Sequence, residues 1–211
     1  MLAYAALGAL HGINPAMGWL FAVALALRAR RRAKIALAIP PIVLGHLASV
    51  AVIVAAIGMA RLFIDPTLVR IAGALALVLF GGYKLLAARM HPRWVGMRVG
   101  FGDLTLWSFV MSSAHGAGLM LIPVLLHRAP APSGDMAAHS LAGASGPMQG
   151  IMLGGLAAVA VHTAVFATMT AAVAMLVYEV FGLGFLRRAW VNLDALWAGA
   201  LVAAGLVTLV A

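Results

Sequence analysis

Four histidines lie inside hydrophobic segments of the sequence, where lipid-compatible side chains are expected. Two of them are followed directly by glycine, in "LHGINP" and in "SAHGAG". A polar side chain in the core of a bilayer costs free energy and therefore needs a function or a partner. Neutral imidazole nitrogens suit transition-metal cations such as Zn, Cu, Fe, Co and Ni. The candidate ligands are His11, His46, His115 and His162.

Small polar side chains accompany three of these histidines at a distance of three residues, and a further serine lies close to His115. Residues three apart share one face of a helix, so each of these helices should carry a narrow polar stripe. The stripes should face one another and add oxygen and amide groups to the same site. The polar residues expected there are Asn14, Ser49, Ser112 and Ser113.

Helix-breaking residues follow the two His-Gly pairs. Pro15 removes a backbone hydrogen bond close to Gly12, so the first helix should kink or open there. Gly116 and Gly118 should loosen the later helix or let a neighbour approach closely. Backbone carbonyls freed in this way are tolerated in a membrane only where they face protein or a wet cavity.

The composition places these residues in a membrane protein. Of 211 residues, 65% are hydrophobic and only 9% are charged, whereas soluble domains carry roughly 25% charged residues. An α-helix needs about 20 apolar residues to cross a bilayer. We predict an all-α membrane protein with six transmembrane helices, near residues 2–27, 36–60, 66–88, 103–126, 150–178 and 190–211.

Three of the histidines should lie near the middle of the bilayer. His46 stands 12 residues after Lys34, and His115 and His162 stand 12 residues after the expected starts of their spans at 103 and 150; twelve residues correspond to about 18 Å along a helix. His11 should lie somewhat nearer the outer surface.

The basic residues indicate the orientation of the chain. Eleven of the 14 Lys and Arg residues fall in the first, third and fifth connections between spans. Cytoplasmic loops carry such an excess. Both termini should therefore lie on the outer side of the cytoplasmic (inner) membrane. The formal charge of +9 is therefore explained by orientation and does not predict binding to nucleic acid.

The polar motifs recur in the two halves of the chain. Each half carries one histidine on its first span and one on its second. Because three spans precede the second half, related halves would form an inverted repeat, a common construction of secondary transporters. We expect repeats at 1–102 and 103–211, with a flexible extracytoplasmic loop at 127–149.

The histidine-led "HGINP" motif and the short six-helix frame resemble the LysE-type transporter superfamily, nearest its nickel/cobalt (NicO and NiCoT) branch. The nickel permeases carry an Asp and a second His at the end of this motif, where this chain has Asn14 and Pro15. The resemblance implies transport of a divalent transition metal such as nickel or cobalt, which would be substrate and not a tightly bound cofactor.

Two other functions remain open at this stage. One is export of a small organic solute, as in the amino-acid branch of the same superfamily. The other is a membrane protein in which two histidines bind a haem. An enzyme is not expected, because no buried acid accompanies Ser112, Ser113 and His115. Asp194 should cap the last helix and could also act as a gate, and a homo-oligomer is compatible with the sequence.

Overall fold

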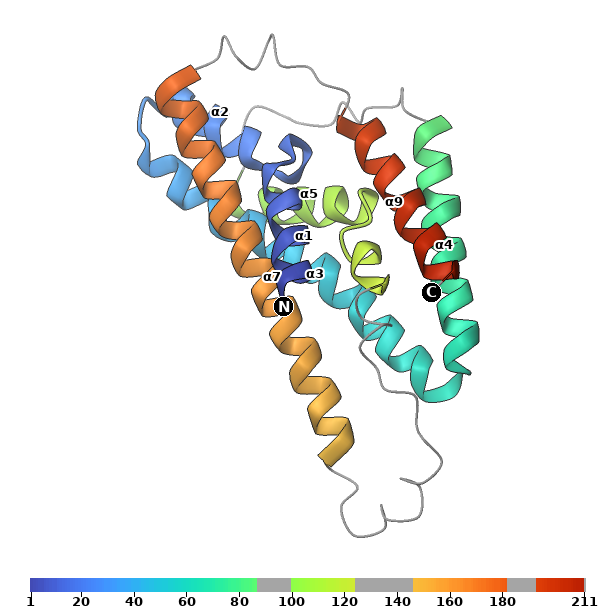
Figure 1. Ribbon diagram of the computed structural model, residues 1–211. Coiled ribbons are helices and arrows are strands. Elements are labelled where there is room, and N and C mark those ends of the chain that lie inside the picture. The colour runs from blue at the N-terminus through green and yellow to red at the C-terminus, as the bar shows by residue number, and fades with distance from the viewer. Residues whose placement is uncertain (87–99, 124–145, 182–192, 211) are drawn as a thin grey trace.

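The computed structural model describes residues 1–86, 100–123, 146–181 and 193–210, and all regular elements in these ranges are helices. Figure 1 shows them as two long crossing helices, a separate pair at one side, and shorter helices between. The elements are α1 (Leu2–Ile13), the 3-10 turn η1 (Pro15–Met17), α2 (Trp19–Ala29), α3 (Ala33–Phe63), α4 (Pro66–Leu86), α5 (Phe101–Ala114), the 3-10 turn η2 (Leu119–Leu121), α7 (Gly146–Leu176), the π-helical turn η5 (Val177–Phe181) and α9 (Leu193–Val210).

Three helices of the described chain are long and apolar enough to cross a membrane. The segments concerned are Ala33–Ala60, Thr67–Leu86 and Gly155–Val180. Three further apolar helices are shorter, at Leu2–Ile13, Trp19–Ala29 and Ala198–Val210. The prediction of an all-helical protein with membrane-spanning helices is therefore confirmed at this level.

The helices pack in pairs that are distant in sequence. α4 packs along α9, α3 along α5, and α1 along α7. α3 also contacts α7 and α2, which brings the α3–α5 and α1–α7 pairs together. The α4–α9 pair stands beside them as a unit of its own (Figure 1).

Two expected spans are interrupted where the sequence places Pro15 and Gly116. α1 ends at Ile13, and Pro15 opens η1 before Gly18 (φ +124°) leads into α2. α5 ends at Ala114, and Gly116 adopts φ +70° before η2. Both glycines occupy backbone conformations that L-residues disfavour. Gly12 lies inside α1, and Gly118 packs against Ile53 of α3.

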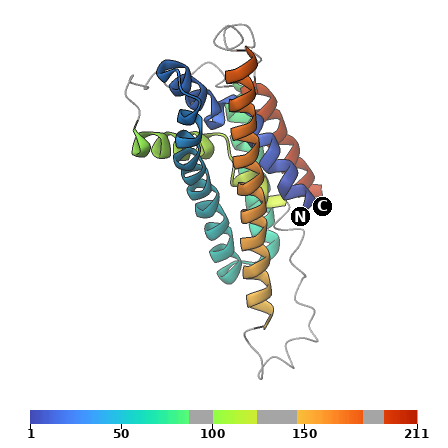
Figure 2. The same cartoon turned by 90° about the vertical axis from the view of Figure 1, so that its left-hand side faces the viewer.

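The direction of α5 differs from that of an upright span over 103–126. Figures 1 and 2 both draw α5 crosswise to α3 and α7. The turn over His115–Gly118 explains this, because the chain can change direction there before η2 begins.

Aspartate side chains accept hydrogen bonds from backbone amides at the starts of two helices. Oδ2 of Asp103 accepts a hydrogen bond from the Gly100 amide at 2.9 Å. Oδ1 of Asp65 accepts one from the Thr67 amide at 2.7 Å at the start of α4. Such caps satisfy amide groups that a helix leaves without partners.

Replacing Asp65 with alanine should lower the thermal unfolding midpoint at pH 7. The hydrogen bonds from Thr67 lower the pKa of the Asp65 carboxyl below its usual 3.8. The cap therefore stabilises the fold above the unfolded-state pKa, and its contribution disappears as the pH falls through the lower folded-state pKa. Thermal unfolding of both proteins in detergent at pH 7 and in strong acid tests this. An Asp65→Ala difference that is the same at both pH values would contradict it.

Candidate functional site

Three of the four candidate histidines form a compact cluster between α1, α3 and α7. The side chains of His11, His46 and His162 have no exposed surface. The ring centroid of His11 lies 5.5 Å from that of His46 and 5.2 Å from that of His162. The remaining pair, His46 and His162, is stacked with centroids 5.4 Å apart and planes inclined by 17°. Histidines separated by up to 151 residues therefore share one buried position.

Two ring nitrogens of the cluster face each other directly. Nε2 of His46 lies 3.2 Å from Nε2 of His162. Two imidazole nitrogens bound to one tetrahedral cation at about 2.0–2.1 Å would lie roughly 3.3 Å apart. The separation is thus suitable for an N–H···N hydrogen bond, and it is also suitable for a shared cation.

The other ring nitrogens are held by oxygen atoms. Nδ1 of His11 donates to the Leu7 carbonyl at 2.8 Å, and Nδ1 of His162 donates to the Tyr4 carbonyl at 3.3 Å. Because a carbonyl only accepts, the lone pair of each neutral ring must reside on Nε2. Nδ1 of His46 lies 3.0 Å from Oγ of Ser112. Metal-binding histidines are oriented by second partners of this kind.

The fourth histidine stands at the break after α5. His115 is 4% exposed and is the C-cap of α5. Its Nδ1 donates to the Met111 carbonyl at 2.8 Å, the same four-residue bond that His11 makes with Leu7.

The predicted polar partners have three different placements. Ser112 joins the cluster through His46. Ser49 and Ser113 bind each other at 2.9 Å and link α3 to the end of α5. Oδ1 of Asn14 caps η1 by accepting from the Ala16 amide at 3.0 Å. Within the described chain, the buried Nδ2 of Asn14 has no hydrogen-bond partner.

Two residues around the cluster were not predicted as part of it. Phe166 is fully buried and stacks on His46, with centroids 3.8 Å apart and planes at 14°. It follows His162 by four residues, so its position on the same helix face was readable from the sequence. Gly8 carries no side chain because a Cβ there would fall on the carbonyl oxygen of His162. Gly12 is similarly close to α7, since its Cβ would lie 2.7 Å from the Phe166 carbonyl oxygen.

The cluster is not a complete ligand set as it stands. Among the described residues, no three His, Cys, Asp or Glu side chains are already arranged to hold a metal ion. Asp194 is the second residue of α9, but its side chain lies outside the described residues. Residues 127–145 of the predicted loop 127–149 also lie outside the described residues. The last four residues of that predicted loop belong to α7, which begins at Gly146.

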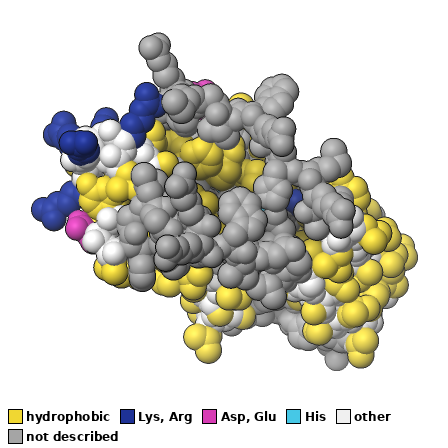
Figure 3. All heavy atoms as spheres, turned by 90° about the horizontal axis from the view of Figure 1, so that it is seen from above, with side chains coloured by type: hydrophobic (Ala, Val, Ile, Leu, Met, Phe, Trp, Pro, Cys, Tyr) yellow, Lys and Arg dark blue, Asp and Glu magenta, His cyan; other side chains and the backbone are white. Residues whose placement is uncertain are grey.

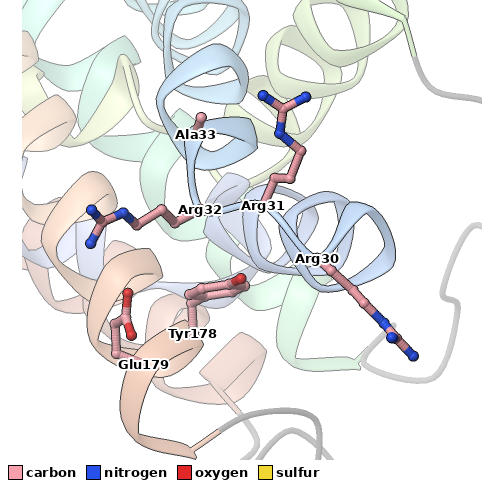
Figure 4. Close-up of a pocket in the computed structure, with 6 residues that line it drawn as sticks. All are labelled: Arg30, Arg31, Arg32, Ala33, Tyr178 and Glu179. Atoms are coloured by element: carbon pink, nitrogen blue, oxygen red, sulfur yellow. The ribbon is translucent and has the colours of Figure 1, made fainter.

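Two surface cavities lie at the end of the molecule that carries basic side chains. One, of about 480 Å³, is bounded by residues of the α2–α3 turn and of η5 (Figure 4). In that view the guanidinium groups of Arg30, Arg31 and Arg32 point in different directions. Figure 3 shows the basic side chains at the rim of this end, beside hydrophobic surface. Because neither cavity is lined by a histidine, we place the candidate site at the buried cluster.

Comparisons with protein-family models, curated proteins and solved structures find no match to this chain. The candidate site must therefore be interpreted from its own geometry.

Proposed function

We propose that this protein is a secondary transporter of a transition-metal cation, with His11, His46 and His162 as the binding residues. The observation that carries the proposal is the arrangement of ring nitrogens. Each ring has its Nδ1 beside an oxygen atom, at 2.8, 3.0 and 3.3 Å. This arrangement allows Nε2 to be the metal-binding nitrogen of all three rings, because a hydrogen-bond partner on the other ring nitrogen commonly orients metal-binding histidines.

The distances within the cluster support a shared cation. Three imidazoles around a tetrahedral ion would place their ring centres roughly 5 Å apart, given metal–nitrogen bonds of about 2.0–2.1 Å. The observed centroid separations are 5.2–5.5 Å. His46 and His162 already have their nitrogens at a suitable distance, and His11 would have to turn its ring to bring Nε2 to the same position. Nitrogen donors of this kind favour nickel, cobalt, copper and zinc over magnesium and calcium.

The pairing of helices supports an inverted repeat. The first three spans correspond to α1 with α2, to α3 and to α4, and the last three correspond to α5 with η2, to α7 and to α9. Exchanging these two sets in order converts the α1–α7 contact into the α5–α3 contact, and it leaves the α4–α9 and α3–α7 contacts unchanged. All four contacts occur. The hydrogen bonds follow the same exchange, because His11 and His115 each bind the carbonyl four residues earlier. Likewise, His46 binds Ser112 on α5 and His162 binds Tyr4 on α1. Six spans with repeats at 1–102 and 103–211 therefore belong to the proposal.

The distribution of charge supports an inner-membrane orientation. The α2–α3 turn and the C-terminal ends of α4 and α7 lie toward the same end of the molecule, at the top of Figure 1. Arg30, Arg31 and Arg32 are exposed at this end. Under the positive-inside rule this end would face the cytoplasm and both termini would lie outside.

One observation favours a second candidate, an exporter of a small organic anion or zwitterion. Nδ2 of Asn14 is a buried donor, and α2 begins only five residues later. Donor groups and helix N-termini at broken helices attract the anionic groups of substrates. A haem between His46 and His162 is less well supported, because two nitrogens bound to one iron from opposite faces would lie about 4 Å apart, not 3.2 Å.

The function is tested by cation flux into proteoliposomes that contain the purified protein. Ni²⁺, Co²⁺, Zn²⁺, Mn²⁺ and Cu⁺ are offered separately at equal concentration, with protein-free liposomes as the control. We expect saturable flux of at least one of the nitrogen-preferring cations and little flux of Mn²⁺. Flux should fall on acidification, because protons compete with metal for imidazole. If no cation crosses and an amino acid does, the second candidate replaces the first.

A further inference from the structure

Ser112 lies between a histidine of the cluster and a buried sulfur atom. Its Oγ is 3.0 Å from Nδ1 of His46 and 3.8 Å from Sδ of Met17. All three side chains are completely buried. A serine hydroxyl donates one hydrogen bond but can accept others. It can therefore donate to the imidazole or to the thioether, and the choice depends on where His46 carries its proton.

The hydrogen bonds within the cluster fix one of these arrangements. Nδ1 of His162 donates to the Tyr4 carbonyl, so its Nε2 is an acceptor. The facing Nε2 of His46, 3.2 Å away, must then carry a hydrogen to avoid two opposed lone pairs. Nδ1 of neutral His46 is consequently an acceptor, and the Ser112 hydroxyl donates to it.

A cation on the cluster requires the opposite arrangement. Nε2 of His46 can bind a cation only after it has lost its hydrogen. The neutral ring then carries hydrogen on Nδ1 and donates it to Ser112. The Ser112 hydroxyl, now an acceptor from His46, turns its own hydrogen toward the sulfur of Met17.

We propose that Ser112 and Met17 form a tautomer switch for His46 that responds to occupation of the site. This inference rests on the proposed function, because the cation is what selects the second arrangement. The two states contain the same protons: the hydrogen that His46 carries on Nε2 in the first state is carried on Nδ1 in the second. Ser112 is thus a positioning residue and not a metal ligand, which revises the role predicted for it from the sequence.

The switch connects the site to the break in the first span. Met17 is the last residue of η1, between α1 and α2, while Ser112 lies in the last turn of α5. η1 contacts α5. Occupation of the site would therefore direct the Ser112 hydrogen to Met17, across the 3.8 Å contact that joins the broken segment of one half to the crosswise helix of the other. A contact that changes with occupation is what coupling of binding to movement requires.

The direct test is ¹⁵N solid-state NMR of histidine-labelled protein in lipid, with and without Zn²⁺, which is diamagnetic. The signals of His46 are identified as those missing in His46→Gln. We expect hydrogen on Nε2 of His46 without Zn²⁺, and hydrogen on Nδ1 with Zn²⁺. Zn²⁺ bound by the wild type and lost in His162→Ala, with His46 unchanged in tautomer, would overturn the switch and leave the proposed function intact. Absence of Zn²⁺ binding by the wild type would count against both.

Variants of Ser112 and Met17 provide an independent measurement. Ser112→Ala should weaken Zn²⁺ binding by about 10- to 100-fold, the usual effect of removing an orienting partner, while Ser112→Thr keeps the hydroxyl and should bind nearly as the wild type does. Met17→Leu preserves apolar volume but removes the acceptor, so it should weaken binding less than Ser112→Ala does. Thermal unfolding of each variant separates loss of fold from loss of binding. A well-folded Ser112→Ala protein with unchanged Zn²⁺ affinity would contradict the inference.

Discussion

Cation flux should fall about 100-fold or more when His162 is replaced with alanine. Its Nε2 forms the 3.2 Å contact with His46, and its ring lies 5.2 Å from that of His11. Removal of the His162 ring therefore leaves only His11 and His46, and two rings do not surround a cation as three do. Loss of a ligand should cost more than the 10- to 100-fold typical of second partners. The measurement is initial flux of the best transported cation in proteoliposomes with matched protein content.

The control is His91→Ala, which removes a histidine from the basic connection after the third predicted span, outside the described residues. It should transport as the wild type does. The double variant His46→Ala/His162→Ala should be no worse than either single variant, because residues that act as one unit are not additive. Full flux in a folded His162→Ala protein would contradict the site, whatever the control shows.

Which histidine rings would come into contact could be predicted only in part. Counting residues from the expected starts of spans placed His46 and His162 at similar depth, and the structure brings their rings together. The same counting placed His115 with them, although the structure places it at the C-terminal end of α5, bonded to the Met111 carbonyl. Sequence periodicity assigns a residue to a helix face, but it does not say which helix will cover that face.

Serines at similar spacing illustrate the same limit. Ser49 and Ser112 each stand three residues from a histidine, yet Ser112 binds His46 on another helix and Ser49 binds Ser113. The crosswise direction of α5 was also beyond the sequence, because the glycines of "HGAG" indicate a break without giving its angle. By contrast, the α1–α2 break was readable, since proline removes a main-chain donor whatever surrounds it.

The cluster depends on very close approach of helices, which the glycines beside the histidines allow. Gly8 packs against the main chain of α7 at His162, and Gly45 packs against the main chain of α5. The two contacts belong to the α1–α7 and α3–α5 pairs that an inverted repeat would exchange. Each glycine thus positions a histidine on one helix against the polar atoms of its neighbour, without itself contributing a chemical group.

Gly45→Ala should therefore strongly reduce both stability and flux. A Cβ at this position would fall on the Thr105 carbonyl oxygen and would lie 2.8 Å from the Phe109 amide nitrogen. Neither backbone atom can move without displacing α5. Overpacking of this kind costs about 1–3 kcal/mol of folding stability. Because His46 is the next residue, separation of α3 from α5 should also break the bond between His46 and Ser112.

Gly58→Ala is the matched control on the same helix, since no atom lies within 4 Å of the Cβ that it would add. Alanine is a better helix former than glycine by up to about 1 kcal/mol, so this variant should be as stable as the wild type or slightly more stable. Thermal unfolding in detergent and flux in proteoliposomes are measured on both variants. Equal behaviour of Gly45→Ala and Gly58→Ala would show that α3 and α5 are not in the close contact on which the position of His46 depends. Loss of flux by Gly45→Ala with unchanged stability would instead locate the effect at the His46–Ser112 bond, where a small displacement is sufficient to disturb the site.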